Sequence, residues 1–152
     1  MIARLKAAPD WDAKAYQQFS RLRQRPVNEL LDRVDLQTPQ RIYDLGCGTG
    51  IATQLLAERW PHAQLQGIDS SKQMLEQARC LPINASWQHC NLLDWRPEQP
   101  ADLLFAAAVL HFINGHETLL PNLLGLLNDG GCLAAHMPDW RDALWYRLML
   151  DT

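Results

Sequence analysis

A short apolar segment that runs directly into a glycine-rich turn constrains the fold of this chain more than any other feature. Residues 41–45 (Arg-Ile-Tyr-Asp-Leu) have the length and apolar character of a buried strand, and residues 46–50 (Gly-Cys-Gly-Thr-Gly) follow at once. A helical pattern then begins at Ile51 and stops before Pro61. Glycines let the backbone turn tightly and let a ligand approach without a Cβ in the way, while the free N–H groups of the next helix face it. This succession predicts a ligand site at the end of a strand.

Strand and helix patterns alternate along the rest of the chain. We predict strands over residues 41–45, 64–68, 86–90, 102–107 and 131–136. Helices are expected after Ile51, after Ser70 or Ser71, and over residues 118–127. Residues 1–40 are predicted to form N-terminal cap helices, with Pro26 in the first turn of the second helix, ahead of a core domain over residues 41–152. The order predicts an α/β fold in which a mostly parallel sheet carries helices on both faces.

The spacing of the glycines separates the candidate ligands. The dinucleotide fingerprint GxGxxG requires a glycine at position 51, where this chain has Ile51, and no lysine followed by serine or threonine comes after the turn to make a P-loop. Asp69 ends the second predicted strand, 19 positions beyond Gly50. A carboxylate there can accept hydrogen bonds from both hydroxyls of a ribose. The alternative is that Asp69 only caps the helix that follows.

The stretch over residues 44–50 resembles the first motif of class I, S-adenosylmethionine-dependent methyltransferases, which have a Rossmann-like, doubly wound sheet. The resemblance implies a strand order of 3-2-1-4-5 and S-adenosyl-L-methionine as the cofactor. It assigns the amino group of the methionyl part to Asp44 and the ribose to Asp69. The cofactor-binding residues expected from it are Asp44, Gly46, Cys47, Gly48, Gly50, Asp69, Ser70, Met74, Asn91, Leu92 and Ala107.

Three of these assignments have alternatives. Asp44 either binds the amino group through a charge-assisted hydrogen bond or only caps the turn. Met74 either faces the adenine or simply packs in the core. Asn91 stands where the family commonly has an acidic residue for the adenine amino group; its side-chain carbonyl can still accept that hydrogen bond, without charge assistance. Asp94 is nearby and is an alternative acceptor.

Longer segments resemble trans-aconitate methyltransferases, which esterify a carboxylate of a small tricarboxylic acid. The similarity runs over nearly the whole chain from Asp10 and includes residues 23–26, 29–31, 67–71, 97–99 and 137–139. It implies a small-molecule carboxylic acid as substrate, with no nucleic acid and no membrane as partner. An ionised carboxylate, of reference pKa about 4, can attack an activated methyl group without a general base. Positioning then does most of the catalytic work, and no catalytic residue is assigned.

Five positions bear on the identity of the substrate. The relatives carry asparagine where this chain has Ala107, and glutamine and tryptophan where it has His111 and Phe112. A tricarboxylate must be held by cations, and Arg23 and Arg25 are the candidates, with solvated helix-surface charges as the alternative for each. His111 either contacts the substrate or has a structural role.

Composition narrows the remaining possibilities. The formal net charge of −3, from 14 basic and 17 acidic residues, provides no electropositive field that would gather nucleic acid or anionic lipid. The longest apolar run, residues 103–113, is about half the ~20 residues of a membrane-spanning helix, and the N-terminus is unlike a secretory signal, so we expect a cytoplasmic protein. The four cysteines form no CxxC pair, which indicates neither a zinc site nor disulfides, but reduced and mostly buried thiols.

The end of the chain raises a last set of expectations. Methyltransferases of this class continue past the fifth strand through a helix and an antiparallel strand pair, whereas this chain stops at Thr152. We therefore expect an incomplete fold, an exposed edge on the fifth strand and possible homodimerisation through that edge. Three hypotheses stay open: an active small-molecule methyltransferase, a truncated module that binds the cofactor without turnover, and a nicotinamide-dependent oxidoreductase, which Ile51 disfavours.

Overall fold

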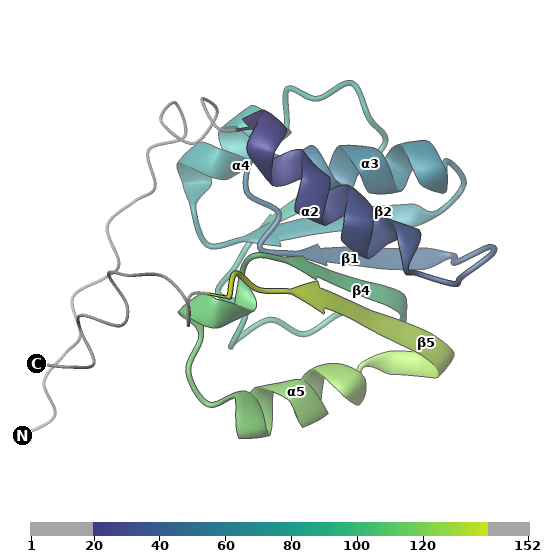
Figure 1. The fold of residues 1–152 in the computed structure, drawn as a ribbon, viewed down its shortest axis with the longest axis vertical. Coiled ribbons are helices and arrows are strands. Elements are labelled where there is room, and N and C mark those ends of the chain that lie inside the picture. Colours follow the sequence, from purple (N-terminus) through teal and green to yellow (C-terminus); the bar gives the residue numbers. More distant parts are fainter. Residues whose placement is uncertain (1–19, 140–152) are drawn as a thin grey trace, which may run out of the picture.

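The computed structural model describes residues 20–139, which form a five-stranded sheet flanked by helices (Figure 1). The strands are β1 (Arg41–Leu45), β2 (Gln64–Asp69), β3 (Ser86–His89), β4 (Ala101–Ala107) and β5 (Leu127–His136). They lie in the order β3-β2-β1-β4-β5, and every neighbouring pair is parallel. The predicted α/β fold and strand order are confirmed.

Helices cover both faces of this sheet. Helices α2 (Ser20–Asp32) and α3 (Ile51–Arg59) share one apolar core with it, and α5 (His116–Leu124) shares the other. Helix α4 (Lys72–Ala78) packs along β2 and β3, and a short 3₁₀ turn, η1 (Leu110–Phe112), follows β4. This is the arrangement of a doubly wound sheet. None of the helices in the described part of the chain is long and apolar enough to cross a membrane.

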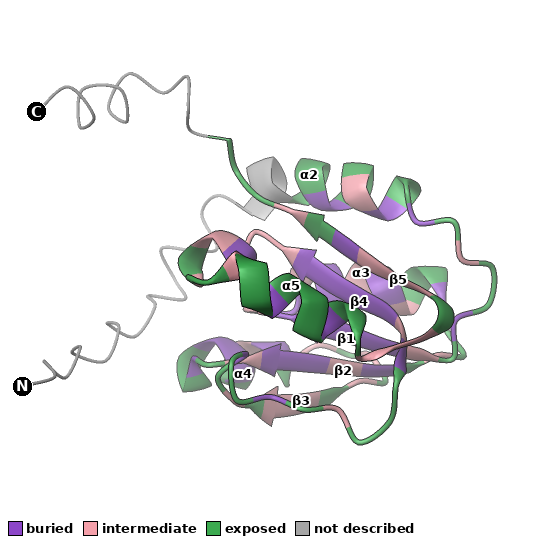
Figure 2. Ribbon diagram, turned by 90° about the horizontal axis from the view of Figure 1, so that it is seen from below, coloured by how far each residue is buried: buried purple, intermediate pink, exposed green. Residues whose placement is uncertain are grey.

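Strand β4 lies at the centre of both cores. Leu103 and Phe105 pack on the side of α2 and α3, while Leu104 and Ala106 pack on the side of α5. The strand is buried almost throughout (Figure 2). A continuous apolar run is typical of a parallel strand that is covered on both faces.

Helix α2 packs directly on the sheet. Val27 and Leu31 belong to the same core as β1 and β4. At the end of α3, the Arg59 guanidinium donates hydrogen bonds to the carbonyls of Leu31 (2.5 Å) and Val34 (2.9 Å), which ties α3 to the end of α2 and the loop that follows it. The assignment of residues 1–40 to a separate cap stays a prediction, because residues 1–19 lie outside the described part.

Several predicted boundaries are wrong. Helix α2 begins at Ser20, so Pro26 lies inside it and not in its first turn. A proline removes only one intrahelical hydrogen bond, and the burial of Val27 and Leu31 does not depend on where the helix starts. Helix α5 ends at Leu124, three residues before the predicted end, and β5 begins at Leu127. The early start of β5 follows from its pairing with Ala101 across an irregular register.

The four cysteines are free, but they are not mostly buried. Cys47 is buried, Cys90 and Cys132 are partly buried, and Cys80 is exposed just after α4. The prediction of mostly buried thiols is therefore wrong, since Cys80 falls where the helix has already ended and packing no longer covers it.

Candidate cofactor site at the glycine turn

The predicted site residues gather where parallel strands end. The glycine turn follows β1, Asp69 ends β2 and Ala107 ends β4, and the arrowheads of β1, β4 and β5 lie on the same side of the molecule in Figure 1. Asp44 pairs in register with Gly67 of β2 and with Phe105 of β4. Ligands of open parallel sheets collect at this edge, beside the point where strand order reverses. Here that point lies between β1 and β4.

Gly46, Gly48 and Gly50 have different neighbours. All three have positive φ angles of 68°, 55° and 84°, a conformation that L side chains rarely adopt. A Cβ on Gly46 would overlap the Val109 side chain, and a Cβ on Gly50 would lie 2.6 Å from Leu81 Cδ1. A Cβ on Gly48 would meet no atom within 4 Å. Close packing within the protein explains the outer two glycines, and Gly48 is the one that borders open space.

Asp44 is buried beneath this turn. Its exposed fraction is 1%, and its Oδ2 accepts a 2.5 Å hydrogen bond from the Thr53 hydroxyl of α3. Its Oδ1 is also buried, yet it has no hydrogen-bond partner within the described residues. Buried polar atoms in proteins are almost always paired, so a carboxylate oxygen left open is a candidate for a ligand contact.

The surroundings of Asp44 disfavour its charge. Burial, with a smaller contribution from the nearby Asp69 carboxylate, raises the pKa of Asp44 from 3.8 to about 7. The Thr53 hydroxyl and backbone N–H oppose this shift. A cation beside Oδ1 would favour the ionised form, because an opposite charge stabilises a buried carboxylate. The site is therefore suited to an ammonium group.

Asp69 points toward the glycine turn. Its Oδ2 accepts a hydrogen bond from the Gly48 N–H and its Oδ1 accepts one from the Ser71 N–H, both at 2.8 Å. The N-cap of α4 is Ser71, whose hydroxyl accepts from the Met74 N–H at 3.4 Å. Asp69 thus braces the turn against β2, and each of its oxygens keeps a lone pair for a further donor.

The other predicted cofactor residues near β2 have mixed surroundings. Cys47 is buried, and burial is the main cause that raises the pKa of its thiol, followed by the charges of Asp44 and Asp69. Ser70 is exposed, and its carbonyl bonds a ring nitrogen of His89 at 2.9 Å. Met74 is buried on α4. The thiol is therefore in its neutral form, and Ser70 is open to solvent.

Asn91 already uses its side-chain oxygen. The Oδ1 accepts a hydrogen bond from the Leu93 N–H at 3.0 Å, and its backbone carbonyl accepts from Asp94 and Trp95 at 3.0 Å each. These bonds close a turn after β3 in which Leu92 is buried. The amide NH₂ of Asn91 and the carboxylate of Asp94 are the exposed polar groups of this turn.

The predicted substrate residues lie on separate elements, the two arginines on α2 and His111 on η1. Arg25 is exposed on α2 and pairs with Glu29 at 2.7 Å, as the alternative of a surface charge expects. Arg23 lies on α2, but its side chain is outside the described residues. His111 lies in η1, and its ring packs on Phe112 with 3.9 Å between the centroids. Ala107 ends β4 and pairs with His136 of β5.

Two residues beside the site were missed from the sequence. Thr53 bonds Asp44, and its signal is a polar residue on the buried side of an otherwise apolar helix start. His136 ends β5 at the same edge as Asp69 ends β2. A rule that considers the last residue of every predicted strand would have found it.

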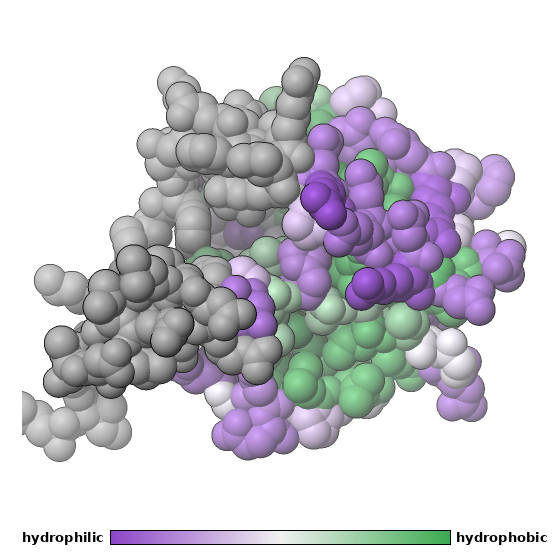
Figure 3. Space-filling view, viewed as in Figure 1, coloured by the Kyte–Doolittle hydropathy of each residue, from purple (hydrophilic) through white to green (hydrophobic). Residues whose placement is uncertain are grey.

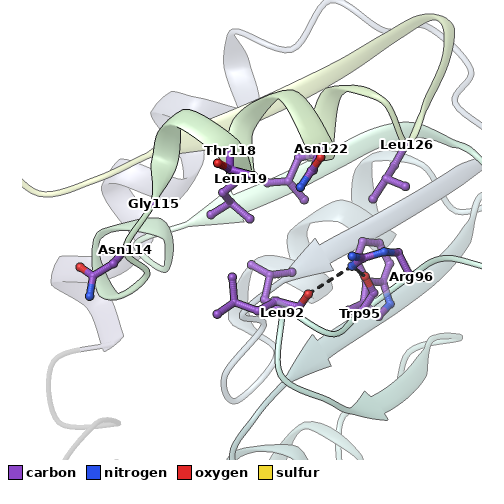
Figure 4. Close-up of a pocket in the computed structure, with 11 residues that line it drawn as sticks. Leu92, Trp95, Arg96, Asn114, Gly115, Thr118, Leu119, Asn122 and Leu126 are labelled. Atoms are coloured by element: carbon purple, nitrogen blue, oxygen red, sulfur yellow. Dashed lines mark hydrogen bonds between the residues drawn. The ribbon is translucent and has the colours of Figure 1, made fainter. Parts of the chain in front are cut away.

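Away from the glycine turn, a hollow of about 370 Å³ lies between residues 92–96 and α5 (Figure 4). Leu92 is its one predicted cofactor residue, and its lining includes no carboxylate. The Arg96 guanidinium donates to the carbonyls of Leu93 and Trp95 in its own loop. Without a carboxylate, this hollow does not meet the requirements of an ammonium or a ribose.

The family comparison accounts for the geometry of the glycine turn. Residues 42–131 match a family described as a methyltransferase domain. The chain belongs to this methyltransferase family. The matched residues run from β1 into β5 and so include the glycine turn, Asp69 and Asn91. This membership gives no support to the hypothesis of a nicotinamide-dependent oxidoreductase.

Curated relatives are similar over nearly all of this methyltransferase chain. It is 72% identical over 141 residues to the trans-aconitate 2-methyltransferase of Pseudomonas paraeruginosa and 44% identical over 144 residues to that of Azoarcus sp.. The alignments cover 93% and 95% of this chain but 51% and 57% of the relatives. The chain therefore spans about half the length of the curated relatives it matches.

Solved structures share the fold. The plantazolicin methyltransferase BpumL, in complex with a pentazolic desmethylPZN analog and SAH, has a TM-score of 0.65 at 23% identity, over 88% of this chain and 51% of that one. DesVI of Streptomyces venezuelae has a TM-score of 0.71 at 16% identity, over 89% of this chain and 61% of that one. At such identities the likeness shows the fold alone.

Proposed function

We propose that this chain is the cofactor-binding part of an S-adenosylmethionine-dependent methyltransferase that forms a methyl ester on a small carboxylic acid. The observation that carries the proposal is the open, buried Oδ1 of Asp44 beneath a turn in which Gly48 borders free space. The names of the curated relatives support trans-aconitate as the acid. Because the chain spans about half of those relatives, the experiment below tests cofactor binding and not turnover.

The residues of the turn fit the parts of this cofactor. Asp44 would hold the amino group through Oδ1, and Asp69 would hold the ribose hydroxyls through its remaining lone pairs. The adenine would lie toward Met74, Asn91 and Leu92, with Asp94 as an alternative partner. When bound, the cofactor supplies a methyl group that is already activated on a sulfonium. An acid that is ionised at neutral pH needs no general base, so the task of the protein is to position it.

Calorimetry with S-adenosylhomocysteine tests the cofactor proposal. We expect the wild type to bind, Gly48→Val to lose binding because its side chain enters the free space, and Asp69→Ala to bind at least about 10-fold more weakly, as the loss of a hydrogen bond to a charged group predicts. Gly130→Val is the matched control, since Gly130 also has positive φ (78°) and no atom within 4 Å of an added Cβ. A folded wild type that gives no heat of binding refutes the proposal.

We also propose that the chain forms a homodimer through β5. This strand is at the edge of the sheet, where its outer N–H and C=O groups lack a neighbouring strand among residues 20–139. Figure 3 shows apolar side chains gathered over α5 and β5, and Leu120 and Leu124 of α5 are 37% and 54% exposed. Sedimentation should show a dimer that Leu124→Lys weakens, and a monodisperse monomer refutes it.

The free cysteines support a reducing compartment such as the cytoplasm.

A further inference from the structure

The ends of β4 and β5 form a second polar corner beside the glycine turn. Ala107 pairs in register with His136, and the Ala108 N–H donates to the His136 carbonyl at 3.0 Å. Ala108 has a φ of 56°, and no other non-glycine residue of the described chain has a positive φ. Non-glycine residues held in this conformation cluster at functional sites. The chain turns there into η1, which carries His111.

This corner is in direct contact with the proposed cofactor turn. Val109 packs so closely on Gly46 that an added Cβ would overlap it. The segment that carries His111 therefore rests on the first glycine of the turn. A molecule bound at this corner would lie next to a molecule bound over Gly48.

His136 influences the charge of His111. Burial lowers the pKa of both His111 and His136, and the charge of His136 lowers that of His111 further. Both rings are therefore neutral at pH 7, so each has one N–H donor and one acceptor nitrogen. His111 and His136 are both partly buried.

His136 has a buried ring nitrogen that the protein does not pair. Its Nε2 is buried and has no hydrogen-bond partner within the described residues. Two other histidines have such partners: the Nε2 of His89 bonds the Ser70 carbonyl at 2.9 Å, and that of His116 bonds the Leu110 carbonyl at 2.7 Å. An unpaired buried donor calls for an explanation, and a ligand oxygen is one.

We propose that His136, together with His111, binds a carboxylate of the methyl acceptor, with the His136 Nε2–H donating to a carboxylate oxygen. The inference rests on the proposed function, because that function makes the acceptor a carboxylic acid. A carboxylate also favours the imidazolium form, which strengthens the hydrogen bond. In the described structure Arg25 is paired with Glu29, and the proposal gives the histidines the role that the sequence assigned to this arginine.

Nuclear magnetic resonance on the ¹⁵N-histidine-labelled chain, saturated with S-adenosylhomocysteine, tests the proposal with trans-aconitate as the probe. We expect the ring signals of His136 and His111 to move with the acid and not with its neutral trimethyl ester. Affinity for the acid should fall at least about 10-fold in His136→Phe, which keeps an aromatic ring but loses the donor. His136→Gln keeps a donor near the same place and should recover part of the affinity. His62→Phe, in an exposed turn, is the control.

The outcomes separate this inference from the proposed function. If the wild type does not bind S-adenosylhomocysteine, both the cofactor proposal and this inference are wrong. If the wild type binds S-adenosylhomocysteine but not trans-aconitate, the carboxylate inference alone is wrong. It is also wrong if His136→Phe and His111→Phe both bind the acid within about twofold of the wild type. Circular dichroism and S-adenosylhomocysteine affinity confirm that each variant is folded.

Discussion

Two aspartates at opposite ends of the same sheet differ in how completely the fold pairs them. Asp102, near the start of β4, accepts hydrogen bonds from the backbone N–H groups of Gln40 (2.8 Å) and Arg41 (2.9 Å) on one oxygen. Its other oxygen accepts from the Asn128 amide at 2.6 Å. Asp44, near the end of β1, has one oxygen paired and one buried without a partner in residues 20–139. The fold uses both oxygens of Asp102 at the edge of the sheet away from the glycine turn, which is a structural role, whereas the open oxygen of Asp44 is available to a ligand.

The pKa values follow the same contrast. Burial raises the pKa of Asp102, but the Asn128 amide, the two backbone N–H groups and the Arg41 charge together bring it below its ordinary value. Burial dominates for Asp44, whose pKa rises to about 7. The comparison shows that the balance between burial and the hydrogen-bond donors nearby, and not residue type, decides whether an aspartate stabilises this fold as an anion.

The largest expected effect is on ligand affinity. Asp44→Asn keeps the shape of the side chain but removes its charge, so S-adenosylhomocysteine should bind about 10- to 100-fold more weakly, the loss expected for a hydrogen bond between charged groups. Calorimetry at about pH 7.5 measures this loss of affinity. Asp102→Asn is the control, and we expect it to bind within about twofold of the wild type. Equal losses of affinity in Asp44→Asn and Asp102→Asn would show that the two ends of the sheet do not differ in ligand binding.

The next effect is on stability. Asp102→Ala leaves three donors without their acceptor and should lower the free energy of unfolding by about 2 kcal/mol. Urea denaturation measures it. Asp44→Asn should cost less at neutral pH, because it removes a buried carboxylate that is only half paired. A greater loss of stability in Asp44→Asn than in Asp102→Ala would contradict this expectation.

A smaller effect separates the two aspartates by pH. The folded pKa of Asp44 is above its ordinary value, so its contribution to stability is present below about pH 4 and is lost as pH rises to about 7, by up to about 1.4 kcal/mol per pH unit. Asp102 behaves oppositely: its contribution is present above its ordinary pKa and is lost as pH falls through the lowered value. Denaturation of wild type and Asp44→Asn at about pH 5 and about pH 7 should show the wild type losing stability relative to the variant. A constant difference would mean that Asp44 does not titrate in this range.

The smallest effect concerns Thr53. Thr53→Val removes the hydroxyl that donates to Asp44, so the pKa of Asp44 should rise further and the midpoint of the pH dependence of ligand binding should move upward by about one unit. Thr53→Ser keeps a hydroxyl and should leave the midpoint near that of the wild type. Calorimetric titrations across the pH range measure both variants, and an unmoved midpoint in Thr53→Val would show that the hydroxyl does not govern the charge of Asp44.

Sequence reasoning succeeded where neighbouring residues carry the information. The five strands and the tight glycine turn follow from apolar runs and from glycines at positions 46, 48 and 50, the strand order follows from the resemblance to class I methyltransferases, and the structure confirms all three. It failed for Pro26 and for the start of β5, since element ends depend on pairing and packing with distant residues. It also predicted that all three glycines make room for a tight turn and a ligand, although Gly46 and Gly50 allow close packing with Val109 and Leu81.

The sequence by itself determined the chain of strands and helices and the placement of Asp44 and Asp69 at strand ends, because period and spacing are properties of adjacent residues. Only the tertiary structure decided that Asp44 has an open oxygen and that His136 lies near His111. Hydrogen-bond partners and burial depend on groups brought together from separate strands, and no local pattern records which of them remain unpaired.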